Sequence, residues 1–155
     1  MPTTVATRPK PSGITPALHG LVGLVLELEG RQGGEIGVVL ADDPILREFN
    51  RRWRKIDRAT DVISFAYDEH SADRATRPVT GDIVISMDRV LAQAKRYRVT
   101  PARELARLVI HGTLHLCGHD HVRAAQRRVM REHEKRAMKS AGVPIRALEK
   151  KLRSP

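Results

Sequence analysis

The sequence predicts an α+β fold in which a small mixed β-sheet is packed with helices. Three observations support this class. Residues 34–41, 62–65 and 82–86 are short runs rich in Val and Ile, as strands are. The segments between and after them repeat apolar residues at helical spacing. The chain has 155 residues, enough for one core but not for two full domains.

We expect residues 14–150 to form a single domain. Residues 1–13 are rich in Pro, Thr and Arg, and we expect a flexible N-terminal segment there, with a short edge strand as the alternative. Residues 68–80 are polar and indicate a loop between two strands.

Capping signals mark the helix starts. A residue that can act as N-cap precedes a proline in three places, Thr15–Pro16, Asp43–Pro44 and Thr100–Pro101. Ser86 is the expected cap of a helix that runs to Tyr97. Each of these residues can accept a hydrogen bond from a backbone N–H of the first helical turn.

The helix that begins at Thr100 is expected to end at Gly118, where a glycine allows the positive φ that turns the chain back. A basic helix should follow over residues 122–141. Gly142 and Pro144 are expected to stop it.

The composition favours a polyanionic partner. The chain carries 28 Lys and Arg against 18 Asp and Glu, a net charge of +10, and nucleic acid is the usual partner of such a charge. The alternative is that the charge serves solubility alone. A single cysteine, Cys117, and the lack of a long apolar run predict a cytoplasmic protein with no membrane association.

The stretch "HGTLHLCGHDH", residues 111–121, holds four of the seven histidines. His111 and His115 are one helical turn apart on one face, the spacing that a metal needs from two helical imidazoles. After the Gly118 turn, His121 can return as a third ligand. Three protein ligands leave a fourth position open, which is typical of catalytic zinc. The pattern predicts a metal site on a helix-turn with one zinc ion per chain.

Other residues of this stretch carry alternatives. His119 is the rival third ligand, whereas Cys117 is better explained as a small buried hydrophobe. Asp120 could orient a ligand or cap the next helix. Gly112 stands where metalloproteases of this ligand spacing carry their general-base Glu, which argues against a protease.

With two further blocks, the histidine stretch resembles the YbeY family of bacterial endoribonucleases and rRNA maturation factors. The blocks are "NRRWRKIDRATDVISF" (50–65) and "GDIVIS" (81–86), and Met130 and Glu134 fit a later M-x-x-x-E. The chain departs from the family pattern at Trp53, Ala59, Ala66, Thr80 and His119.

The resemblance implies an α+β fold, His111, His115 and His121 as zinc ligands, and Arg54 as the active-site cation. It also implies action on single-stranded RNA, maturation of the 16S rRNA 3′ end and ribosome quality control. The small ribosomal subunit and its assembly factors are the implied partners.

The residue chemistry agrees with a role for Arg54, because a guanidinium can stabilise charge that develops on phosphate oxygens. Four basic residues near it could bind the RNA backbone, or form a solvated helix face: Arg51, Arg52, Lys55 and Arg58. The nucleophile, water or the ribose 2′-hydroxyl, stays open.

The function predicted from the sequence is a zinc-dependent endoribonuclease specific for single-stranded RNA. Two alternatives remain. One is a ribosome-assembly factor that binds RNA and holds a mainly structural metal; the other is a metal-dependent hydrolase of a different substrate.

Overall fold

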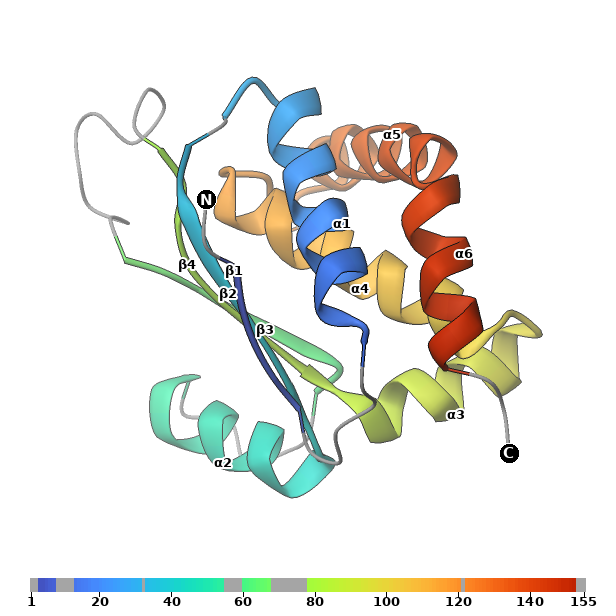
Figure 1. Cartoon of the computed structure of the whole chain (residues 1–155). Coiled ribbons are helices and arrows are strands. Elements are labelled where there is room, and N and C mark those ends of the chain that lie inside the picture. The colour runs from blue at the N-terminus through green and yellow to red at the C-terminus, as the bar shows by residue number, and fades with distance from the viewer. Residues whose placement is uncertain are drawn as a thin grey trace.

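The computed structural model describes residues 3–7, 13–31, 33–54, 60–67, 78–120 and 122–152, with residues 3–7 and 53–54 described by their backbone alone. Strands and helices are mixed along these residues (Figure 1). In chain order the elements are β1 (Thr3–Thr7), α1 (Thr15–Leu28), β2 (Glu35–Ala41), α2 (Asp43–Arg54), β3 (Val62–Ala66), β4 (Thr80–Ser86), α3 (Met87–Tyr97), α4 (Pro101–Leu116), α5 (Ala124–Ser140) and α6 (Gly142–Lys151).

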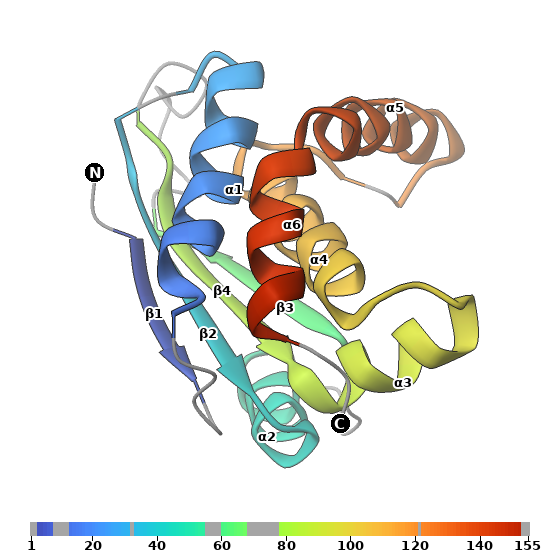
Figure 2. The ribbon, with the colours of Figure 1, turned by 45° about the vertical axis from the view of Figure 1, so that its right-hand side comes forward.

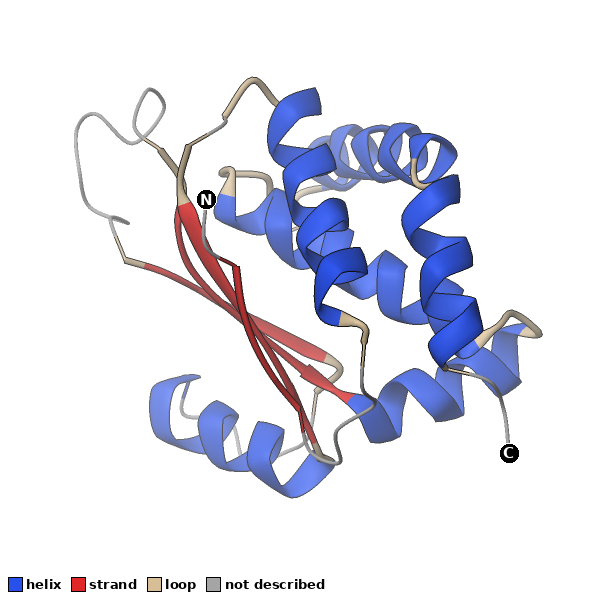
Figure 3. Cartoon of the chain, in the orientation of Figure 1, coloured by secondary structure: helices blue, strands red, loops and turns tan. Residues whose placement is uncertain are grey.

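The four strands form one mixed sheet in the order β1-β2-β4-β3. β1 and β4 pair parallel to β2, and β3 pairs antiparallel to β4 at the sheet edge. Helices α1, α4, α5 and α6 lie on one side of the sheet and α2 on the other (Figures 2 and 3). The predicted α+β class with a small mixed sheet is confirmed.

The two faces of the sheet bury separate sets of side chains, because alternate residues of a strand point to opposite faces. On β4, Ile83 and Ile85 belong to the main core beneath α1 and α4. Val84 lies between them in sequence and packs instead with Leu46 of α2. The position of α2 opposite α4 therefore follows from the alternation of β4.

Helix α4 is the centre of the main core. It contacts α1, α3, α5, α6, β3 and β4, and 11 of its 16 residues are buried. A helix buried on most of its circumference has little surface to offer solvent. Three of the half-buried positions that remain carry polar side chains: Arg107, His111 and His115.

Gly112 sets how closely α4 approaches the sheet. A Cβ atom at this position would lie 2.8 Å from Cγ2 of Ile83 and 3.2 Å from Oγ of Ser64. The hydroxyl of Ser64 donates to the Gly112 carbonyl at 3.2 Å. The glycine thus brings the helix backbone directly onto strands β3 and β4.

Several expectations from the sequence are confirmed. The strands predicted at 34–41, 62–65 and 82–86 are β2, β3 and β4, each within two residues of the predicted bounds. Ser86 and Thr100 cap α3 and α4 through their side-chain oxygens. The residues expected to form a loop before β4 include 68–77, which lie outside the described residues.

Two predicted caps are wrong. The N-cap of α1 is Ile14, with Thr15 as the first helical residue, and it makes no side-chain cap hydrogen bond. The carboxylate of Asp42, rather than that of Asp43, accepts the N–H of Ile45 at the start of α2. The hydroxyl of Ser86 donates to Oδ1 of Asp43 at 2.6 Å, so the Asp43 carboxylate is directed to Ser86 and not to the first turn of its own helix.

Two elements were not predicted as the structure has them. Thr3–Thr7, within the segment expected to be flexible, forms the edge strand that was the alternative. Gly142 and Pro144 do not end the chain's helical part but begin α6. A proline is accommodated in the first turn of a helix because the N–H that it lacks has no partner there.

None of the described helices is both long enough and apolar enough to cross a bilayer.

Gly112→Ala should lower the free energy of unfolding by about 1–3 kcal/mol relative to Gly23→Ala, because the new methyl overpacks the contact between α4 and the sheet. Gly23 is the matched control: it lies inside α1, and a Cβ there would meet nothing within 4 Å. Both variants gain helix propensity, so their difference reports packing alone. Chemical denaturation of the two variants measures it, and equal stabilities would contradict the close approach.

Candidate metal centre

The structure brings His111 and His115 together on α4. Their ring centroids are 4.8 Å apart and the rings meet edge to face at 75°. The His111 side chain is 21% exposed, so it is neither sealed in the core nor on the open surface. Two imidazoles one turn apart on a rigid, mostly buried helix are well placed to share one ion.

Glu134 of α5 orients the first of these histidines. Its Oε1 lies 2.5 Å from Nδ1 of His111. A carboxylate in this position can accept the Nδ1 proton, and in the neutral form of the ring Nε2 is then the nitrogen available to a metal. Helix α5 therefore supports the pair from outside α4.

The charge around Glu134 keeps its carboxylate ionised. Burial by itself raises the pKa of Glu134. The hydrogen bond from His111 and the nearby positive charge of Arg107 contribute to lowering it, and the net shift places the pKa below its ordinary value. An ionised carboxylate is the form that can accept the His111 proton and fix the tautomer.

The turn after α4 has the conformation that the sequence predicts. Gly118 has φ +105°, a backbone angle that residues other than glycine rarely adopt. The N–H groups of Gly118 and His119 close the turn on the carbonyls of His115 and Leu114, each at 3.0 Å. His121, the expected third ligand, lies outside the described residues, and its role stays a prediction.

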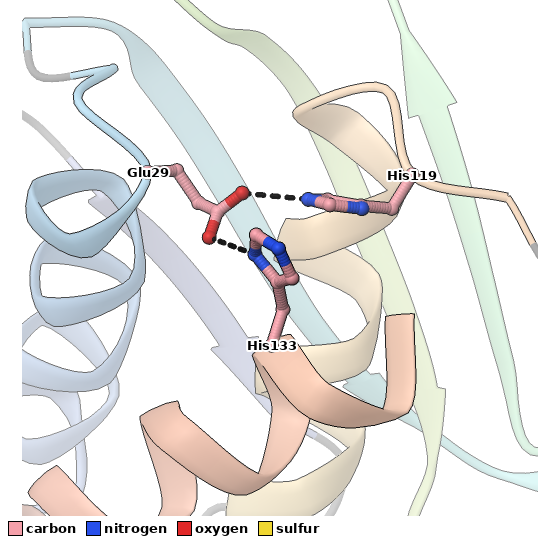
Figure 4. Close-up of side chains that lie close together, drawn as sticks. All are labelled: Glu29, His119 and His133. Carbon is pink, nitrogen blue, oxygen red and sulfur yellow. Dashed lines mark hydrogen bonds and ion pairs between the residues drawn. The ribbon is translucent and has the colours of Figure 1, made fainter. Parts of the chain in front are cut away.

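His119 is joined to a different group of side chains (Figure 4). Its Nε2 lies 2.6 Å from Oε1 of Glu29, and Nδ1 of His133 lies 2.6 Å from Oε2 of the same carboxylate. The centroids of the two imidazole rings are 4.3 Å apart. Potential ligand atoms of these three residues all lie within 4.8 Å of one another, the one such set among the residues that the structure describes.

The carboxylate at the centre of this second set is also ionised. Burial by itself raises the pKa of Glu29, but hydrogen bonds from His133 and His119 lower it by more, and the net shift is downward. Arg136 adds a contact to Oε2 at 3.2 Å.

A residue just after α1 also hydrogen-bonds to Cys117, the first residue of the turn after α4. Arg31 donates to the carbonyl of Cys117 at 3.1 Å. Cys117 itself is half-buried and packs against the main core, as a small hydrophobe does. The turn is thus held from α1 at both Cys117 and His119.

The predicted basic residues lie on or after α2. Arg51 pairs with Glu48 at 2.6 Å on the surface, and Arg52 is exposed. The side chain of Arg54 and all of Lys55 and Arg58 lie outside the described residues. Helix α2, whose last residue is Arg54, lies on the face of the sheet opposite α4 (Figure 3).

The sequence analysis missed Glu29 and His133 as potential ligands, and it named Glu134 only as part of a motif. The signal for Glu134 was its helical neighbourhood with Met130, which is buried and turns that side of α5 inward. Nothing in the local sequence pairs Glu29 with residues about a hundred positions later.

The chain is similar to known proteins over most of its length. The family model described as "Endoribonuclease YbeY" matches residues 15–142. The "Endoribonuclease YbeY" of Chloroflexus aggregans is 45% identical over 117 residues, covering 72% of this chain and 76% of its own length. That of Carboxydothermus hydrogenoformans is 40% identical over 122 residues, covering 79% and 82%.

A solved structure shares the fold. The solution structure of TM1509 from Thermotoga maritima superposes with a TM-score of 0.67 at 24% identity, covering 94% of this chain and 93% of that one. The family match and the curated relatives, which agree with the motifs around His111, show that this chain belongs to the YbeY family of endoribonucleases.

Proposed function

We propose that this protein is a zinc-dependent endoribonuclease that cleaves single-stranded RNA at the site built on His111, His115 and His121. The observation that carries the proposal is the His111–His115 pair, oriented by Glu134, in a chain whose relatives are named endoribonucleases. The finer role follows the family resemblance: maturation of the 16S rRNA 3′ end and quality control on the small ribosomal subunit, in the cytoplasm.

The residues present fit a metal ion. The Nδ1 proton of His111 is bound by Glu134, so the other ring nitrogen is the one available as a ligand. Three histidines and no cysteine in the set suit zinc at a site that keeps one position open. A metal held there would supply Lewis-acid assistance to phosphodiester cleavage.

The chain's own residues supply orientation and charge. Glu134 fixes the His111 ring, and Arg54 is the proposed cation for charge developing on the phosphate oxygens. Helix α2, which carries Arg54, and α4 lie on opposite faces of the sheet, so the proposed cation and the His111 site belong to elements from both sides of it (Figure 3). Arg51, Arg52, Lys55 and Arg58 are the proposed contacts to the RNA backbone.

The alternative of an RNA-binding assembly factor is favoured by one observation, the exposed basic surface of α5. All four of its arginines, Arg127, Arg128, Arg131 and Arg136, are exposed on the helix that also carries Glu134. Such a surface would bind RNA through its phosphates whether or not cleavage follows. Turnover of a single-stranded substrate distinguishes the two functions.

The central test is cleavage of a single-stranded RNA oligonucleotide by the purified chain. Chelation should abolish cleavage and added zinc should restore it. His111→Ala and His115→Ala should each lower the rate by about 100-fold or more, because the ion loses a ligand. Undiminished cleavage by His111→Ala, or cleavage that persists in chelator, would refute the proposal.

Glu134→Gln should weaken zinc binding at this site by about 10–100-fold, since the ring of His111 loses the carboxylate that orients it. The control is Glu132→Gln on the same helix. The Glu132 carboxylate is exposed, and its Oε1 lies 3.6 Å from Nζ of Lys135 in a surface ion pair. Zinc titration against a competing chelator measures both. Equal affinities in the two variants would show that Glu134 does not support the ligand.

Arg54→Ala should slow single-turnover cleavage by about 100-fold with zinc content unchanged, as expected for a donor that meets charge in the transition state. Arg54→Lys keeps the charge but loses the planar fork and should also be impaired. Arg51→Ala, which removes the partner of a surface pair with Glu48, is the control and should change RNA affinity alone. If Arg51→Ala slows cleavage and Arg54→Ala does not, the assignment is wrong.

A further inference from the structure

Glu29, His119 and His133 form a set of polar side chains that the proposed reaction does not use. We call them the Glu29 group. They come from three segments: Glu29 follows α1, His119 lies in the turn after α4, and His133 lies on α5 (Figure 4). The group shares no residue with the His111 site.

We propose that the Glu29 group binds a second divalent metal ion, of the kind that imidazole and carboxylate ligands prefer, namely zinc. Two histidines and one glutamate are a ligand set that zinc takes up in proteins. The inference goes beyond the proposed function, because it concerns other residues and a second ion per chain.

The geometry is close to what such an ion needs. Zinc lies about 2.0–2.2 Å from nitrogen and oxygen ligands, so two ligand atoms of a tetrahedral site lie about 3.3–3.6 Å apart. The ligand atoms of the Glu29 group lie within 4.8 Å of one another. Changes of up to about 1 Å in these separations would bring the ligand atoms to that spacing, and the ion would replace the two protons that lie between nitrogen and oxygen.

Burial favours a defined site over a chance surface cluster. The side chain of Glu29 is 9% exposed, and those of His119 and His133 are 18% and 32% exposed. A carboxylate shielded to this extent keeps its charge only beside cations or strong donors. The three side chains are thus held together from three segments before any ion arrives.

Arg136 is the competitor for this carboxylate. Its Nη2 lies 3.2 Å from Oε2 of Glu29 and also donates to the carbonyl of Leu28 at 2.8 Å. The side chain is 51% exposed, so it can leave the carboxylate for solvent when an ion binds. Its charge lowers the affinity of the site for a second cation.

The proposal is tested by zinc titration of the full chain after the metal has been removed by chelation. The wild type should take up two equivalents. Glu29→Gln and His133→Gln should each keep one equivalent and bind the other about 100-fold or more weakly. Arg136→Met should tighten binding of the second equivalent by about fivefold, since a competing cation is removed.

His19→Gln is the matched control, because it removes a half-buried histidine of α1 that belongs to neither site. It should retain two equivalents. Circular dichroism and melting temperature of each metal-free variant check folding. His133 is the more exposed member of the group, so His133→Gln remains informative if Glu29→Gln does not fold.

The outcomes separate this inference from the proposed function. One equivalent in the wild type, lost in His111→Ala and kept in His133→Gln, overturns the second site and leaves the proposed function intact. One equivalent that is lost in His133→Gln and kept in His111→Ala upholds the Glu29 group and overturns the His111 site. Two equivalents, one lost in each variant, support both.

Discussion

The contact of α4 with the sheet at Gly112 is the constraint on which the rest of the structure depends. Only a residue without a side chain lets this helix lie against Ile83 and Ser64. With Gly112 turned toward the sheet, the positions on either side of it along the helix point elsewhere. His111 is thereby directed to α5, where Glu134 accepts its proton.

This constraint also accounts for the missing general base. In metalloproteases of the same ligand spacing, the residue after the first histidine is a glutamate. Here that position lies against β3 and β4, and a carboxylate there would be driven into the sheet. The same helical histidine pair therefore serves a site whose remaining polar groups come from other elements, foremost α5.

Helix α5 links the two sets of potential ligands. His133 and Glu134 are consecutive, and on a helix consecutive side chains diverge by about 100°. One meets Glu29 and His119, and the other meets His111. A small movement of α5 would therefore change both sets together. The turn at Cys117–His119 is bonded to Arg31 and Glu29 at the end of α1. Its position therefore also depends on how these helices pack together.

The sequence by itself determined the features that depend on neighbours along the chain. Helical spacing joined His111 to His115, the glycine at 118 marked the turn, and Ser86 and Thr100 marked two caps, because each of these interactions spans only a few residues. The strands β2, β3 and β4 were recognisable from their own β-branched runs.

The tertiary structure alone decided which distant segments of the chain come into contact. The sequence analysis assigned the cap of α2 to Asp43. In the structure the hydroxyl of Ser86, a distant residue, donates to the Asp43 carboxylate instead. It did not predict that Glu29 would meet His119 and His133, or that Glu134 would meet His111. These pairs form because the packing of α1, α4 and α5 around one core brings their ends together, and no local pattern encodes that packing.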